Sequence, residues 1–449
     1  MDRNKRNLIL FIISYFTNNL ISGILYDTYV NYLQEVSLSV ATSFWAFYGY
    51  ASFISALIII MVPKIGYKKL IMFSSLSCAL ALFAVIYLQS PMVFFATTIL
   101  SLVGVQLHFI MLAPYVAAYT GGLGDKKINW YSRAYYIGYV GYFVSTYLGG
   151  LFTVKMFARH AGVGFQVAKE YSSYIADVTP ELREAYLMGN KDVLLISAII
   201  SLIALIPALM ISERKTDYYV VNSDETKISL RDKLIGFIRI LLNKDALTYV
   251  LYWAIISFSM GMFTSYFTVY LNRNLHIAKS TASLMVSLSY IAIVLFMLIT
   301  PICVKKFGRV GTISLTLLLS IPFMLIIANG NKFGAYMIPV VGIALFMRSG
   351  LANLGSPAES SLNMAIVPKN LRPAFTSLIN IIAGIVSIIS GNFTGKYLFL
   401  EQSGYKTAYY YAAALYFVAF LVMFIGLKKY NRQTNDEIEE EEKYEQHIQ

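Results

Sequence analysis

Long apolar runs alternate with short polar connections along the whole chain. A helix that crosses a bilayer needs about 20 mainly apolar residues, because lipid offers the backbone no hydrogen-bond partners. Runs of this kind recur at residues 8–33, 42–62, 70–88, 92–119, 133–153, 192–211, 246–271, 282–303, 311–328, 335–366, 374–395 and 407–427. The pattern therefore predicts an all-α integral membrane protein with twelve transmembrane helices.

The polar segments divide the chain into four parts. These are an N-terminal six-helix half, a central loop, a C-terminal six-helix half and an acidic tail, at 1–211, 212–245, 246–427 and 428–449. From Ile228 the central loop has apolar residues at helical spacing, which predicts an amphipathic helix on the membrane surface or a plain linker helix. The long connection 154–191 contains Thr179-Pro180-Glu181, which is typical of a helix start.

Basic residues indicate how the chain is oriented. An even number of spans places both termini on one side. Of the 36 Lys and Arg residues, 25 fall in the termini and in the connections on that side, and ten fall in the opposite connections. Since cytoplasmic segments carry the excess of positive charge, we expect both termini in the cytoplasm and a multi-pass protein of the plasma or inner membrane. This placement accounts for the net charge of +12 without nucleic acid as a partner.

The composition and the residue spacing indicate which kinds of site the protein is expected to lack. Charged residues make up 13% of the chain, about half the usual share of a soluble domain. We find no histidine cluster, nucleophile pair or metal-ligand spacing, so we expect no enzyme, no cofactor and no metal site. The segment GNFTGK from Gly391 is one residue too short for a phosphate-binding loop.

The two halves repeat each other at an offset of about 240 residues. Gly23 aligns with Gly261, and Pro114 aligns with Pro357. The basic loops PKIGYKK, from Pro63, and KKFGRV, from Lys305, occupy corresponding places after the second and eighth spans. A constant offset in successive spans indicates two parallel six-helix repeats.

In these features the whole chain resembles the major facilitator superfamily. The family pattern Gly-x-x-x-Asp-Arg-x-Gly-Arg-Arg after spans 2 and 8 corresponds here to Lys64, Gly66, Lys68, Lys306, Gly308 and Arg309. Pro63 and Lys305 stand where the family has Asp, so the inner salt bridge that holds its outward-open state is not carried over. The resemblance implies a secondary transporter that works by alternating access, with these loops as gates, and no subfamily is identified.

Ionisable side chains inside the spans are the first candidates for functional residues. Each costs at least about 2.5 kcal/mol at the bilayer centre, so each should have a function or a partner. Asp27 lies some 19 residues into span 1, roughly 28 Å from its inner end. Its repeat counterpart is Ser265. We expect Asp27 either to exchange protons and couple them to transport, or to be a fixed partner of a basic group or a hydrogen-bonded residue of an outer cavity.

Arg348 is expected near the midplane in span 10. A guanidinium stays charged there and needs an anion, for which the substrate, Asp27 and Glu359 are the candidates. Glu359 lies roughly 16 Å further along the helix, so a direct pair requires a break in the helix. Gly350, Gly355 and Pro357 favour such a break.

Other polar and aromatic residues of the spans are weaker candidates. Asn19 and Asn353 can hydrogen-bond a solute or can hold helices together. His108 can relay protons or can be a packed, hydrogen-bonded residue. Tyr266 and Trp253 can stack on a ligand, although aromatic residues are abundant enough for packing to explain either one.

The sequence as a whole favours transport over other functions. We expect secondary active, proton-coupled transport of a small polar or ionisable organic solute by a monomer in the lipid bilayer, at a site between spans 1, 4, 7 and 10. One alternative is an exporter of lipophilic cations, which Asp27 would suit and Arg348 would oppose. Another is a membrane receptor or assembly factor that has the fold without transport.

Overall fold

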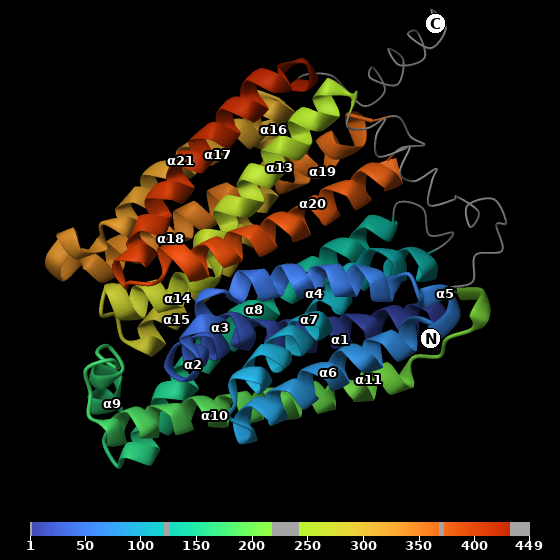
Figure 1. Cartoon of the computed structure of the whole chain (residues 1–449). Coiled ribbons are helices and arrows are strands. Elements are labelled where there is room, and N and C mark those ends of the chain that lie inside the picture. The colour runs from blue at the N-terminus through green and yellow to red at the C-terminus, as the bar shows by residue number, and fades with distance from the viewer. Residues whose placement is uncertain (1, 121–125, 218–241, 368–371, 432–449) are drawn as a thin grey trace, which may run out of the picture. The chain divides into compact units, whose positions relative to one another are not determined.

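The computed structural model describes residues 2–120, 126–217, 242–367 and 372–431, and these ranges are almost entirely helical (Figure 1). Eleven of the described helices are long and apolar enough to cross a membrane, and the shorter apolar helix Phe44–Ile59 occupies the predicted second span. The predicted all-helical membrane architecture is therefore confirmed. The amphipathic helix expected from Ile228 and the acidic end of the tail lie outside the described residues.

The first six spans follow the predicted order. They comprise α1 (Arg3–Ile24) with η1 (Leu25–Tyr29) and α2 (Val30–Val36), α4 (Phe44–Ile59), α6 (Tyr67–Tyr87), α7 (Pro91–Tyr119), α8 (Lys126–Ala161), and α10 (Pro180–Ile203) with α11 (Leu205–Met210). Three short helices connect them, α3 (Leu38–Thr42), α5 (Val62–Ile65) and α9 (Phe165–Tyr171), and η2 (Lys215–Asp217) follows the sixth span.

The last six spans contain more interruptions. They comprise α13 (Lys244–Phe263) with η4 (Thr264–Tyr266), α14 (Phe267–Val269) and η5 (Tyr270–Asn274), α15 (Lys279–Leu298) with α16 (Thr300–Phe307), α17 (Arg309–Ala328), η6 (Gly330–Tyr336) with α18 (Met337–Leu354) and α19 (Ser356–Ala365), α20 (Arg372–Phe393) with η8 (Thr394–Leu398), and α21 (Ser403–Gly426) followed by η9 (Lys428–Asn431). The break expected in span 10 lies at Gly355, between α18 and α19.

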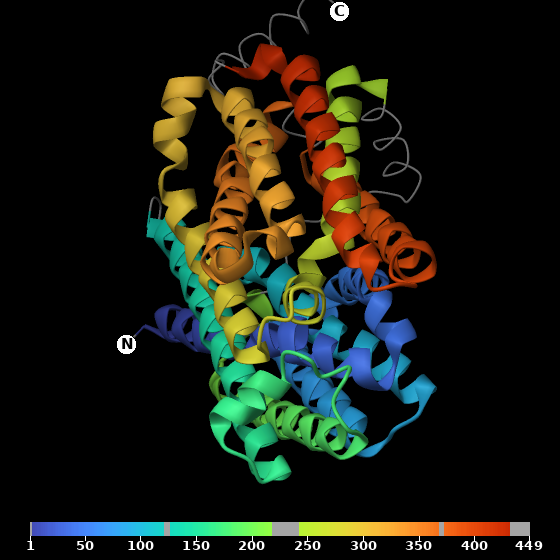
Figure 2. The same ribbon diagram turned by 90° about the vertical axis from the view of Figure 1, so that its left-hand side faces the viewer.

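The connection between spans 5 and 6 is shorter than the sequence predicted. Helix α8 continues to Ala161 and α10 already begins at Pro180, so only residues 162–179 lie between them (Figure 2). The charged residues at these helix ends lie beyond the apolar run, and they remain helical because nothing in the sequence stops the helix there. The predicted start at Thr179 is confirmed: its Oγ accepts a hydrogen bond from the Leu182 N–H at 3.4 Å.

The chain forms two compact units. The first comprises Met1–Val221, Met262–Ile291 and Ser387–Lys406, and the second comprises Asn222–Gly261, Ala292–Val386 and Thr407–Gln449. Spans 7, 8 and 11 thus contribute one end each to the first unit. The predicted boundaries at 211, 245 and 427 between two halves, a loop and a tail stay predictions.

Small residues allow α1 and α8 to lie against each other in the first unit. A Cβ added to Gly141 would lie 3.0 Å from Cβ of Asn19, and one added to Gly23 would lie 2.0 Å from Oγ of Ser145. In a bilayer no hydrophobic effect drives one helix against another, because lipid tails are as apolar as the side chains. Close approach of the two backbones, as seen here, is what stabilises helix pairs in membranes. The pairing holds span 1, which carries Asp27, against span 5.

Candidate functional site

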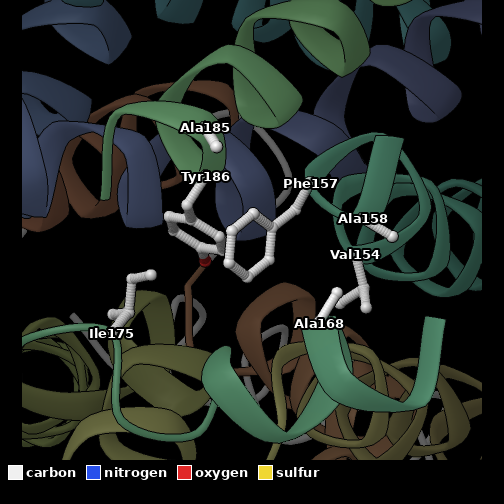
Figure 3. Packing of buried hydrophobic residues seen from close by; sticks show 7 residues of the cluster. All are labelled: Val154, Phe157, Ala158, Ala168, Ile175, Ala185 and Tyr186. Atoms are coloured by element: carbon white, nitrogen blue, oxygen red, sulfur yellow. The ribbon is translucent and has the colours of Figure 1, made fainter. Parts of the chain in front are cut away.

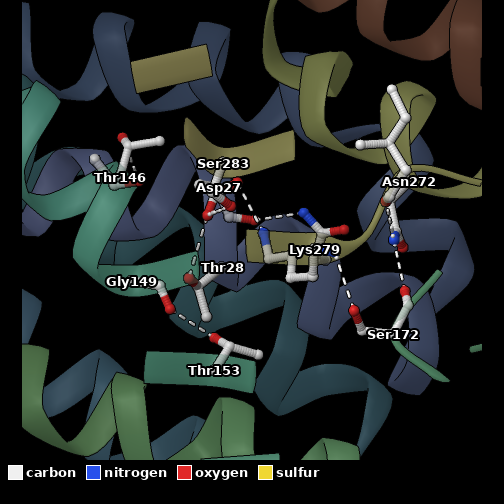
Figure 4. A network of polar contacts seen from close by, with 12 residues as sticks. Asp27, Thr28, Thr146, Gly149, Thr153, Ser172, Asn272, Lys279 and Ser283 are labelled. Atoms are coloured by element: carbon white, nitrogen blue, oxygen red, sulfur yellow. Dashed lines mark hydrogen bonds and ion pairs between the residues drawn. The ribbon is translucent and has the colours of Figure 1, made fainter. Parts of the chain in front are cut away.

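Asp27 lies at the centre of a buried polar cluster in the first unit (Figure 4). Its Oδ1 accepts a hydrogen bond from Nζ of Lys279 at 2.8 Å, and its Oδ2 accepts one from Oγ of Ser283 at 2.9 Å. Thr28 contacts the same carboxylate at 3.4 Å. The side chains of Lys279 and Asp27 are 0% and 2% exposed, so the two charges neutralise each other away from solvent. We call Asp27, Thr28, Lys279 and Ser283 the Asp27 cluster.

The backbone at Asp27 is irregular in a way that the sequence did not reveal. Asp27 is the middle residue of η1, a π-helical turn inserted into span 1. Similar π turns, η5 and η8, occur in spans 7 and 11. Single π turns inside α-helices are frequent at functional sites, because they free a backbone carbonyl and re-aim side chains. Here the carbonyl of Asp27 accepts a hydrogen bond from the side chain of Asn31 at 2.8 Å.

Two glycines of α8 make room for the cluster. A Cβ added to Gly150 would lie 2.2 Å from both Cβ and Oγ of Ser283. A Cβ added to Gly149 would lie 2.7 Å from Cδ1 of Ile24 and 3.1 Å from Oγ1 of Thr28. Spans 1 and 8 can therefore both approach span 5 at this level only because the two positions lack side chains.

A second ionic cluster lies near the end of span 1. Glu35 pairs with Arg183 at 2.7 Å and also with Arg273, and its side chain is 1% exposed. The backbone carbonyl of Arg273 accepts a hydrogen bond from Gln402, at the start of span 12. A buried carboxylate thus joins the ends of spans 1, 6 and 7. We call Glu35, Arg183 and Arg273 the Glu35 cluster.

The predicted residue Tyr266 belongs to the same unit but not to the Asp27 cluster. Its hydroxyl donates to the backbone carbonyl of Thr42 at 2.9 Å, and its ring packs edge-on against Phe399. Thr394 donates to the same carbonyl at 3.0 Å. Nearby, Gln34 donates to the hydroxyl of Tyr405 at 2.8 Å. Tyr266 therefore joins the end of span 7 to α3 and to the end of span 11.

Asn19 and His108 are both satisfied within the helix packing of the first unit. Asn19 donates to the carbonyl of Tyr15 at 2.6 Å in its own helix. His108 is fully buried and contacts Ser14 at 2.9 Å through Nε2 and Ser74 at 2.6 Å through Nδ1. Since Ser74 donates to the backbone carbonyl of Gly104, its hydroxyl oxygen is free to accept from Nδ1, and the imidazole links spans 1, 3 and 4.

Arg348 and Glu359 belong to the second unit. Nη2 of Arg348 donates to the hydroxyl of Tyr416 at 2.6 Å, and its guanidinium lies 5.6 Å from the centre of that ring. The carboxylate of Glu359 accepts a hydrogen bond from Tyr252. The Asp27 carboxylate, which the sequence offered as a partner for Arg348, is paired with Lys279 instead.

The other two candidates of the second unit lie beside these residues. Asn353 donates to the carbonyl of Ser349 at 2.9 Å within its own helix. Trp253 packs edge-on against Tyr252, with ring centres 6.3 Å apart. Both contacts lie within a single helix, and each residue retains the position in spans 7 and 10 that the sequence indicated.

The two loops that the sequence predicts to act as gates have the same backbone form. Gly66 and Gly308 have φ of +86° and +79°, a left-handed conformation that favours glycine, and each precedes the first turn of a helix. Lys64 and Lys306 lie in the short helices just before these glycines, and Arg309 is the first residue of α17. The repeated glycines thus mark equivalent turns in the two repeats.

Each of these turns receives a side chain from just beyond the last span of its own repeat. Glu213 accepts hydrogen bonds from the N–H groups of Tyr67 and Lys68 at 2.7 and 3.2 Å. Asn431 accepts one from the Gly311 N–H at 2.7 Å. Burial raises the pKa of the Glu213 carboxyl, and the two backbone donors oppose that shift. Both turns are therefore capped by a side chain that follows the last span of the same repeat.

Comparison with known proteins decides the family. The sequence profile of the MFS_1 like family matches residues 119–344, and that of the Major Facilitator Superfamily matches residues 251–447. The chain belongs to the Major Facilitator Superfamily. As a member of this superfamily it is a multi-pass membrane protein and a secondary transporter rather than an enzyme. No curated protein matches the sequence.

Solved structures of other superfamily members share the fold. Nucleoside transporter NupG is 15% identical, with a TM-score of 0.69 over 94% of this chain and 99% of its own. The D-xylose-proton symporter is 14% identical, with a TM-score of 0.65 over 94% and 98%. The fucose:proton symporter FucP of E. coli is 16% identical, with a TM-score of 0.57 over 96% and 98%. At these identities the likeness establishes the superfamily fold alone.

Sequence reasoning found Asp27 but missed its partners Lys279 and Ser283, and it missed the Glu35 cluster. Lys279 and Arg273 were counted among the outer connections, and Glu35 was assigned to the short connection after span 1. Ser283 is one of many serines in the spans. The basic residues at 273 and 279 were a usable signal, because the connections predicted to lie outside carry fewer positive charges than those predicted to lie inside.

Proposed function

We propose that this superfamily member couples the movement of protons to that of a small polar or ionisable organic solute. The observation that carries the proposal is the buried ion pair of Asp27 and Lys279, 2.8 Å apart, between spans 1 and 8. Ionisable groups at span depth are costly and mark ion or substrate pathways. The structures of similar fold include transporters named for nucleosides, xylose and fucose, which supports a polar organic solute.

Protonation of Asp27 is the proposed switch. A neutral carboxyl no longer attracts the ammonium of Lys279, so the contact between span 1 and the beginning of span 8 weakens. The state in which this contact is broken then gains population, as any state does when its competitor loses stabilisation. The Glu35 cluster joins spans 1, 6 and 7 in the same unit and would have to open in the same step. We place both clusters on the outer side of the membrane, with both termini in the cytoplasm.

The ion pair also bears on the alternative of a lipophilic-cation exporter. Such a protein needs an acidic side chain that is free to take the cation. Asp27 already has a cationic partner in Lys279 and a hydroxyl donor in Ser283. A solute that carries no positive charge fits this arrangement better.

Arg348 is the proposed contact for an anionic or strongly polar group of the solute. Arg348 is 4% exposed, and its guanidinium donates to the hydroxyl of Tyr416. Arg348→Lys keeps the charge and loses the planar fork of donors that binds a carboxylate in two places. We expect solute affinity to fall at least tenfold in this variant, and unchanged affinity would exclude a bidentate contact.

The test uses the purified full-length protein in two steps. Thermal unfolding with a panel of nucleosides, pentoses, hexoses and carboxylates identifies a solute, because a ligand at about 100 times its Kd stabilises by about 2.7 kcal/mol. Proteoliposomes with an internal pH dye then report whether that solute moves protons. We expect Asp27→Asn to retain solute counterflow and to lose solute-driven acidification.

Asp192→Asn is the matched control, because Asp192 pairs with His160 at an exposed position of the same unit. It should behave as wild type in both measurements. Counterflow without proton movement in the wild-type protein would contradict coupling, and Asp27→Asn with intact acidification would exclude Asp27 from it. Absence of flux for every stabilising solute would favour a receptor.

A further inference from the structure

The connection between spans 5 and 6 has a hydrophobic core of its own (Figure 3). Seven buried residues from α8, the connection and α10 form it: Val154, Phe157, Ala158, Ala168, Ile175, Ala185 and Tyr186. The rings of Phe157 and Tyr186 meet edge-on, with centres 5.5 Å apart. A Cβ added to Gly189 would lie 2.8 Å from the backbone nitrogen of Phe157, so α8 and α10 are in close contact here. Residues 162–179 are therefore held firmly on the two helices.

This core presents Ser172 to the turn that precedes span 8 (Figure 4). Ser172 is fully buried, and its hydroxyl donates to the carbonyl of Lys169 at 2.6 Å. The same hydroxyl oxygen accepts the backbone N–H of Lys279 at 3.1 Å. The backbone carbonyl of Ser172 accepts a hydrogen bond from the side chain of Asn272 at 2.7 Å. One serine thus binds both ends of the turn between η5 and α15.

The turn itself needs such support. Its residue His276 has φ of +52°, which is unusual for a residue with a side chain. The imidazole of His276 stacks on Tyr174, with ring centres 4.9 Å apart. Helix α15 begins at Lys279, and the preceding residue, Ala278, has no side-chain acceptor for the first N–H groups of the helix. Ser172 supplies the missing N-terminal cap from another part of the chain.

We infer that Ser172 is a positioning residue for the ion pair of Lys279 and Asp27, so that the connection between spans 5 and 6 sets the pH at which the pair opens. The inference rests on the proposed function. Ser172 fixes the backbone of the residue whose ammonium reaches Asp27. The titratable groups that face Asp27 are Lys279 and Tyr290 from span 8 and Tyr186 from α10.

Loss of the cap should change how readily Asp27 takes up a proton. When the first turn of α15 is released, Lys279 stabilises the Asp27 carboxylate less. The carboxylate then accepts a proton at a lower proton concentration, that is, at a higher pH. Loss of a hydrogen bond of this kind changes an equilibrium constant, here that between the closed and the open ion pair, by about tenfold. Ser172→Ala should therefore move the pH midpoint of opening by about one unit to less acidic values.

The experiment needs no solute. A reporter cysteine, Thr146→Cys, lies at a fully buried position of span 5 in the same unit, and a membrane-impermeant maleimide is the probe. Its labelling rate in the full-length protein in membranes is measured from pH 5 to pH 8 and corrected for the pH dependence of a free thiol. The chain without the reporter gives the background from Cys78 and Cys303.

Four variants in the reporter chain test the role of Ser172, and Asp27→Asn in the same chain tests the coupling proposal. Ser172→Ala should shift the midpoint, Ser172→Thr should keep it, and Ser173→Ala, which removes a neighbouring hydroxyl, should leave it unchanged. Ser172→Ala with Ala278→Ser, which gives α15 a cap of its own, should restore it even if the single variant folds poorly.

Two results separate the failure of this inference from that of the proposed function. If Asp27→Asn keeps the pH dependence of labelling, the coupling proposal fails. If Asp27→Asn abolishes it while Ser172→Ala has the wild-type midpoint, or if Ala278→Ser restores nothing, the role of Ser172 is overturned and the coupling proposal stands.

Discussion

Replacing Lys279 alone should destabilise the protein more than replacing Lys279 and Asp27 together. Nζ of Lys279 lies 2.8 Å from Oδ1 of Asp27, and the side chains are 0% and 2% exposed. Removing one member of a buried pair leaves a charge without a counter-ion, at about 3–5 kcal/mol. Removing both leaves no such charge, and the net contribution of a buried pair is itself near zero because desolvation offsets attraction.

A double-mutant cycle measures this difference. Lys279→Met, Asp27→Asn and the double variant are unfolded by heat and by denaturant in detergent at pH 7. We expect the double variant within about 1.5 kcal/mol of wild type and a coupling energy of at least about 2 kcal/mol. The loss of stability caused by Lys279→Met should become smaller toward pH 5, because protonation of Asp27 removes the unpaired charge. Additive effects of the two single variants would refute the reasoning.

Three further predictions use thermal unfolding of the same preparation. Gly150→Ala should lower stability by about 1–3 kcal/mol, because its Cβ would lie 2.2 Å from Ser283, whereas Gly164→Ala, with open space around it, should be neutral. The raised pKa of Glu213 means that the folded state holds the proton more tightly, so wild-type stability falls as pH rises from the ordinary carboxyl pKa through the raised one. Glu213→Gln cannot ionise, so its stability relative to that of the wild-type protein should increase between pH 4 and pH 7. A stability difference that stays constant over this range would contradict the expected direction. Asn431→Ala should cost about 1 kcal/mol at every pH through loss of the cap on the second turn.

The spans were predictable because their signal is local. An apolar run long enough to cross a bilayer has few alternatives to a helix, and both Thr179 and Gly355 act on the residues beside them. The helix ends were less predictable. Charged residues such as Lys155 and Arg159 end an apolar run without ending the helix, which is why α8 extends to Ala161.

The candidate site was predictable only in part. The cost of a charge in lipid pointed to Asp27 and Arg348 from sequence alone. The partner of Asp27 is 252 residues away along the chain, and no rule of spacing selects Lys279 among the basic residues of the connections. Ser172 is harder still to find, because its role depends on a turn whose conformation appears only once the chain is folded.

The π turn around Asp27 makes the end of span 1 sensitive to the number of residues as well as to their identity. A π turn holds one residue more than an α turn, so the chain beyond it is rotated by about 100° relative to an uninterrupted helix. Deleting one residue from Leu25–Tyr29 would shorten the span by only about 1.5 Å. It would nevertheless swing Val30–Val36, and Glu35 with it, toward a different neighbour. In this stretch a change of length acts as a rotation, and an insertion or deletion would re-aim the end of the span as a substitution cannot.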